Sequence, residues 1–140
     1  MRISLILVFS VCVCAVGEER DINLTKAVEG AHLLREMMRD PDSFKVRRAW
    51  VMHSEKYGDA ICYQYQSKNG LGGMDQGLAD FAMHNKRDLA KGKYILDAEA
   101  DASFEFDSRC GKHAEKHDSF VKDVTADVQA SFSEERTVSK

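Results

Sequence analysis

The stretch from Asp59 to Gly77, D-A-I-C-Y-Q-Y-Q-S-K-N-G-L-G-G-M-D-Q-G, decides how this chain folds. Its first half is rich in isoleucine and tyrosine, which favour a pleated, half-buried surface. Side chains alternate between the two faces of a strand, so Ile61, Tyr63 and Tyr65 share one face and Cys62 lies on the other. We therefore predict a central strand here.

The second half of the stretch predicts a chain reversal. Asn69-Gly70 is the strongest short-range hairpin signal, because both residues tolerate positive φ. The adjacent pair Gly72-Gly73 suggests a bulge or a close approach of another segment to bare backbone. With Gly77 these glycines do not form G-x-G-x-x-G, and no Gly-Lys-Ser/Thr follows, so the glycines indicate a turn and not a phosphate-binding loop.

The N-terminus has the pattern of a secretory signal peptide over residues 1–17. A basic start at Arg2 precedes an almost continuous apolar run over residues 3–16, and small residues, Ala15 and Gly17, occupy the positions before the expected cut. The run is too short to span a bilayer comfortably. We expect an exported protein, periplasmic or secreted, with no transmembrane segment after removal of the leader.

Lipid attachment is the alternative fate of the leader. Cys12 and Cys14 lie inside it, and either is a candidate for lipid modification. Val11 is bulky and directly precedes Cys12, which fits a lipoprotein signal badly. We expect both cysteines to be lost with the leader.

The remaining chain fits one acidic domain. Removing residues 1–17 leaves 19 basic against 23 acidic residues, a net charge near −4. This balance disfavours a nucleic-acid or anionic-membrane partner. We predict a single domain over residues 18–134 and a frayed polar tail over residues 135–140.

Two cysteines, Cys62 and Cys110, survive loss of the leader. An even pair in an exported chain indicates one disulfide. Closing a loop of this length stabilises by about 4 kcal/mol in the chain-entropy model. A reactive thiol or a metal ligand is the alternative.

A helix and two further strands frame the central strand. Apolar residues at helical spacing predict a helix from Leu24 to Arg39, with Asn23 as N-cap, Pro41 beyond its end, and Met37 and Met38 as core residues. Strands are expected over residues 43–53 and 78–84. In the first, one face carries Phe44, Val46, Trp50 and Met52, and the opposite face carries Ala49 and Val51.

The C-terminal third carries weaker patterns. Short strands are expected over residues 94–96 and 102–106, where Phe104 and Phe106 alternate with acids. A final helix from about Lys112 is indicated by an apolar stripe of Phe120, Val121, Val124, Val128 and Phe132. The predicted class is α+β, with an antiparallel β-meander of three to five strands packed with an N-terminal and a C-terminal helix.

One constellation suggests metal chemistry. His113 and His117 stand one helical turn apart and Asp118 adds an oxygen donor, but H-A-E-K-H places the glutamate one position too late for the zincin motif. A solvated helix start is the alternative interpretation. We expect no cofactor, and we take Tyr63, Tyr65 and Asn69 as the candidate binding surface for a protein or small-ligand partner.

Three segments resemble a group of small exported bacterial proteins described as uncharacterised: D-P-D-S-F-K-V at 40–46, I-C-Y at 61–63 and K-N-G-L-G-G-M at 68–74. In that group a D-P-x-S-F/L signature leads into a strand, and a C-x-x-Y/V-x-x-K/R-N-G-x-G-G box follows. The resemblance spans about residues 24–84, with a later cysteine matching Cys110. It implies export and the same fold outline, and it brings no catalytic residues.

The leading prediction is therefore an exported, non-enzymatic binding module or envelope-associated domain. One alternative is a small metal-dependent hydrolase that uses His113, His117 and Asp118. Another is a structural, oligomerising protein in which the edge of the hairpin pairs with a second subunit.

Overall fold

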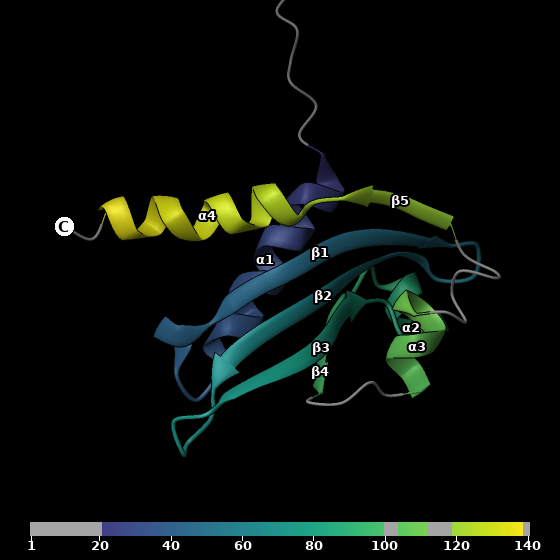
Figure 1. The fold of residues 1–140 in the computed structure, drawn as a ribbon. Coiled ribbons are helices and arrows are strands. Elements are labelled where there is room, and N and C mark those ends of the chain that lie inside the picture. The colour runs from purple at the N-terminus through teal and green to yellow at the C-terminus, as the bar shows by residue number, and fades with distance from the viewer. Residues whose placement is uncertain (1–20, 100–103, 112–118, 139–140) are drawn as a thin grey trace, which may run out of the picture.

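A computed structural model describes residues 21–99, 104–111 and 119–138 (Figure 1). The predicted leader, with Cys12 and Cys14, lies outside these residues. The elements in chain order are α1 (Ile22–Glu36), the 3-10 turn η1 (Pro41–Ser43), β1 (Lys45–Ser54), β2 (Gly58–Lys68), β3 (Met74–Ala82), α2 (Lys86–Ala90), β4 (Ile95–Glu99), α3 (Phe104–Cys110), β5 (Ser119–Asp123) and α4 (Thr125–Val138).

The strands form one antiparallel sheet in the order β4-β3-β2-β1-β5. Strands β1 to β4 follow one another as a meander, and β5 returns to pair with the outer side of β1. The α+β prediction is confirmed. Strand β2 is paired on both sides, and the edge strands are β4 and β5. In the described part of the chain, no helix has the length and apolar character needed to cross a membrane.

Helix α1 begins earlier than its sequence pattern predicts. Asp21, and not Asn23, is the N-cap, and its carboxylate accepts hydrogen bonds from the backbone N–H groups of Asn23 at 3.0 Å and Leu24 at 3.3 Å. The Asn23 side chain instead donates to Asp59 Oδ2 at 2.7 Å, which ties the start of the helix to β2. At the other end, α1 stops at Glu36, before Pro41 opens η1.

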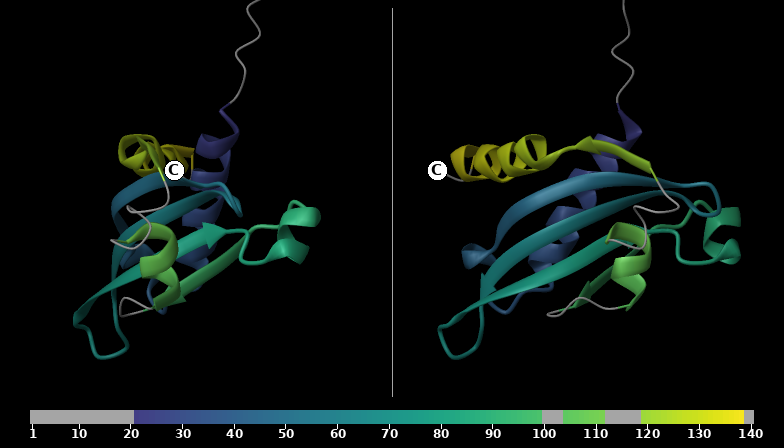
Figure 2. Two further views of the ribbon diagram at one scale, coloured as in Figure 1. Left: turned by 90° about the vertical axis from the view of Figure 1, so that its right-hand side faces the viewer. Right: turned by 45° about the vertical axis from the view of Figure 1, so that its right-hand side comes forward.

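The sheet separates two apolar clusters. Helices α1 and α4 cover one face, and α3 lies on the opposite face (Figures 1 and 2). The larger cluster, under α1 and α4, contains Ala27, Ala31, Leu34, Phe44, Val46, Ala49, Val51, Ile61, Tyr63, Tyr65, Ala79, Phe81, Val124 and Val128. The smaller cluster, under α3, contains Trp50, Met52, Ala60, Cys62, Ala82, Phe106 and Cys110. The predicted faces of β2 are thus confirmed.

A bulge in β1 overturns the predicted faces of that strand. The pairing register with β2 shifts between Val46 and Arg48. One extra residue reverses the alternation beyond it. Val46 therefore shares the α1 face with Ala49 and Val51, whereas Trp50 and the residues after it in the same alternation face α3.

Two predictions in the C-terminal third are wrong. The segment expected to form a strand over residues 102–106 contributes Phe104 to Phe106 to α3, and Phe120 and Val121, expected in a helix, lie in β5. The outer side of β1 needs a hydrogen-bonding partner, and β5 supplies it, with Phe120 paired to Met52. Of the rest of the predicted stripe, Val128 and Phe132 lie in α4, while Val124 directly precedes that helix, which continues past residue 134 to Val138.

Candidate ligand-binding site

Tyr63, one of the three predicted surface residues, is fully buried. Its hydroxyl donates to the carbonyl of Ala27 in α1 at 2.7 Å. The ring end fits because Gly30 has no side chain: a Cβ there would lie 2.5 Å from Tyr63 Oη. Burial raises the pKa of the Tyr63 hydroxyl, and the charge of Glu29 raises it further. The prediction of a surface role for Tyr63 is therefore wrong, because α1 covers it.

Tyr65 lies two residues along the same face, where α1 has ended. Its ring packs over Gly77 of β3, and a Cβ at Gly77 would overlap the ring. Phe44 supports the ring from the side, with ring centroids 5.8 Å apart. Burial raises the pKa of the Tyr65 hydroxyl. The ring is thus fixed in place at the base of the hairpin.

Asn69 organises the turn between β2 and β3. Its Oδ1 accepts the backbone N–H groups of Leu71 at 3.0 Å and Gly73 at 2.9 Å, while its Nδ2 donates to Asp75 Oδ1 at 3.1 Å. Gly72, with φ of 85°, supplies the positive φ that we expected from Asn69-Gly70. The hairpin is present as predicted, and the Asn69 side chain is committed to holding its loop.

Between the end of α1 and this hairpin lies a half-open pocket of about 380 Å³. The segment after α1 contributes Met37, Met38 and Arg39; the hairpin contributes Tyr65, Ser67, Lys68, Asn69, Asp75, Gln76 and Gly77. Two of the predicted surface residues, Tyr65 and Asn69, therefore meet in one cavity. The contribution of residues 37–39 was missed because the sequence interpretation placed both methionines in the core; Met37 is in fact 59% exposed.

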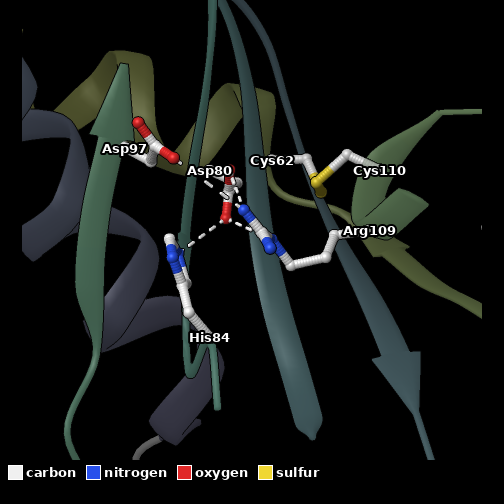
Figure 3. A network of polar contacts seen from close by, with 6 residues as sticks. All are labelled: Cys62, Asp80, His84, Asp97, Arg109 and Cys110. Carbon is white, nitrogen blue, oxygen red and sulfur yellow. Dashed lines mark hydrogen bonds and ion pairs between the residues drawn. A yellow bond between two sulfur atoms is a disulfide. The ribbon is translucent and has the colours of Figure 1, made fainter. Parts of the chain in front are cut away.

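A second polar cluster lies on the α3 face of the sheet (Figure 3). Asp80 of β3 is 2% exposed and accepts two hydrogen bonds from Arg109 of α3, at 2.8 Å from Nε and 3.1 Å from Nη2. His84 Nε2 lies 3.2 Å from Asp80 Oδ2 without hydrogen-bond geometry, and Asp97 Oδ2 lies 4.0 Å from Arg109 Nη2. In the sequence, this cluster could have been suspected from Asp80, an acidic residue within the largely apolar run of residues 78–83.

Beside this cluster the predicted bridge between Cys62 and Cys110 is present, with the two Cα atoms 5.8 Å apart. It joins the central strand β2 to the end of α3, next to the ion pair of Asp80 and Arg109. A buried acid held by two charge-assisted hydrogen bonds is fixed in position. The cluster therefore fastens α3 to the sheet.

The histidine-based alternative falls on a segment that is not described. His113, His117 and Asp118 all lie outside the described residues. Within the described ranges, no group of three or more His, Cys, Asp or Glu side chains is arranged to hold a metal ion.

Comparisons with known proteins add no assignment. A scan against protein-family models gave no match, and searches of curated proteins and of solved structures found no similar chain.

Proposed function

We propose that this protein is a small exported binding module that holds a small organic ligand in the pocket between α1 and the β2–β3 hairpin. The observation that carries the proposal is the pocket itself, at about 380 Å³. Small-molecule sites in proteins occupy roughly 300–1,000 Å³ and combine apolar walls with a few placed polar groups.

The walls of the pocket have this mixed character. Met37 offers a flexible apolar surface, and the Tyr65 ring offers a rigid one held by Gly77 and Phe44. The polar end of the hairpin is preorganised, because Asn69 already bonds the turn. Rigid walls reduce the entropy cost of ordering the site when a ligand binds.

Export is part of the proposal and is supported by two features of the chain. Residues 1–17 have the composition of a signal peptide. The pair Cys62–Cys110 is bridged, and disulfides persist mainly in oxidising compartments.

The test is a screen of small organic fragments by ¹H–¹⁵N NMR on the oxidised protein. We expect hits to shift the backbone signals of residues 37–39 and of the hairpin. Met37→Ser should weaken these hits, while the control Leu33→Ser, which changes an exposed apolar residue of α1 that does not line the pocket, should not. Shifts confined to other surfaces, or equal binding by both variants, would refute the proposed site.

A further inference from the structure

We infer that the ligand of the hairpin pocket carries an anionic group, and that Arg39 binds this group. The inference rests on the proposed function and names the chemical class of the ligand: an organic anion with an apolar body. Four observations carry it: the position of Arg39, the absence of a described carboxylate beside it, the charges of the lining residues, and the apolar walls of the pocket.

Arg39 lines the pocket from the segment that follows α1. Its guanidinium lies against Gly70 at the tip of the hairpin, where a Cβ would come within 2.9 Å of Arg39 Nη1. The absence of a side chain at Gly70 makes room for the guanidinium. The positive charge therefore lies between the two elements that form the pocket.

This guanidinium differs from three others in having no acid beside it. Arg109 binds Asp80, Arg35 lies 3.8 Å from Asp42, and Arg48 lies 3.8 Å from Asp123. Among the side chains that the structure describes (residues 21–98, 106, 108–111 and 120–134), no carboxylate lies within ion-pair distance of Arg39. A guanidinium presents a planar fork of N–H donors that matches a carboxylate or phosphate in two parallel hydrogen bonds.

The charges around the pocket favour an anion. Arg39 and Lys68 carry positive charge, and Asp75 is the one carboxylate among the lining residues that the structure describes. Asp75 already accepts a hydrogen bond from Asn69 Nδ2 at 3.1 Å, so it is engaged by the turn. The net charge of Arg39, Lys68 and Asp75 is therefore positive.

The apolar walls of the pocket indicate the chemistry of the rest of the ligand. Met37 and Met38 form one wall, and the fixed ring of Tyr65 forms another. Burial of an aromatic ring or a short alkyl chain against these groups supplies non-directional affinity, while the anion fixes orientation. The pocket volume of about 380 Å³ is in the range for a ligand of this size.

The experiment compares 3-phenylpropionate with its uncharged amide, 3-phenylpropionamide, and with phenyl phosphate. Each probe is titrated into the full oxidised protein at low salt and followed by NMR. We expect the two anions to bind at the hairpin pocket more tightly than the amide. Arg39→Ala should weaken the anions by about 10- to 100-fold, the usual effect of removing a charged hydrogen-bond partner, and leave the amide unchanged.

Arg47→Ala is the matched control, because Arg47 is an exposed arginine on β1 that is not among the pocket-lining residues. The circular dichroism spectra of both variants should match that of the parent. Equal binding of amide and anions, with no effect of Arg39→Ala, would overturn the inference and leave the proposed pocket in place. No binding of any probe or fragment at the pocket would overturn the proposed function and the inference with it.

Discussion

Replacing Arg109 with methionine tests the buried charge pair that fastens α3 to the sheet. The Asp80 side chain is 2% exposed and the Arg109 side chain 15%, and two hydrogen bonds join them. Methionine keeps an apolar stem but leaves the Asp80 carboxylate buried without its main partner. Removing one member of a buried ion pair costs about 3–5 kcal/mol of unfolding free energy. His84 Nε2 lies 3.2 Å from Asp80 Oδ2 and remains beside the carboxylate in the variant. We therefore expect a loss of unfolding free energy near the lower end of this range, about 3 kcal/mol.

The assay is urea unfolding at pH 7 with the disulfide intact, analysed by linear extrapolation. Asp80→Asn and the double variant complete a double-mutant cycle, which isolates the interaction between the two side chains. We expect the double variant to be more stable than Arg109→Met alone, because the buried charge is then gone. The control Arg87→Met, at an exposed position of α2, should change the unfolding free energy by less than about 0.5 kcal/mol.

Two results would refute this reasoning. One is a loss below about 1 kcal/mol for Arg109→Met, which would mean that the Asp80 carboxylate is readily hydrated or neutralised. The other is a double variant as unstable as Arg109→Met, which would mean that the loss comes from packing of the arginine stem and not from the buried charge.

Three further predictions concern stability. Gly30→Ala places a Cβ 2.5 Å from Tyr63 Oη and should cost about 1–3 kcal/mol in urea unfolding; an unchanged midpoint would contradict the contact. Reduction of the disulfide, which spans 48 positions, should cost about 4 kcal/mol, measured with and without reductant; no change in midpoint would contradict this. Hydrogen bonds from Thr125, aided by the charge of Arg48, hold the pKa of Asp123 below its usual range. This carboxylate therefore stabilises the fold above about pH 4. Asp123→Ala should lower the free energy of unfolding by about 0.5–1 kcal/mol at pH 7, and by progressively less as the pH falls below 4. A difference in unfolding free energy that stays constant with pH would contradict this prediction.

The central strands were predictable because their signals are local. Ile61, Tyr63 and Tyr65 alternate with smaller or polar residues, and Asn69-Gly70 marks the reversal whichever residues pack around it. The helix α1 was found from its apolar spacing, since that spacing depends on the chain alone. These elements could be predicted without knowing which distant residues they contact.

The C-terminal third failed because its short apolar runs fit two structures. Phe104 and Phe106 alternate as in a strand, yet the spacing of four from Phe106 to Cys110 also places both on one face of a helix, and the disulfide holds that face against the sheet. Phe120 fits a helical stripe as well as it fits a strand. The open side of β1, a feature of the folded sheet, selects the strand.

The candidate site was predicted only in part, because it depends on contacts between segments that are far apart in the chain. Tyr63 and Tyr65 share a face and look equivalent in the sequence, but only Tyr63 lies beneath α1, where Gly30 leaves space for it. Met37 and Arg39 are far from the hairpin in the chain, so their part in the pocket depends on how α1 crosses the sheet.

The bridge between Cys62 and Cys110 also closes the polypeptide into a ring that contains most of β2 and all of the hairpin loop, β3, α2 and β4. A protease that cuts one peptide bond between these two cysteines releases no fragment, because both ends remain covalently attached. The hairpin that bears the pocket is inside this ring, whereas Met37 and Arg39 are outside it. A single nick within the hairpin would therefore leave both walls of the pocket on one molecule.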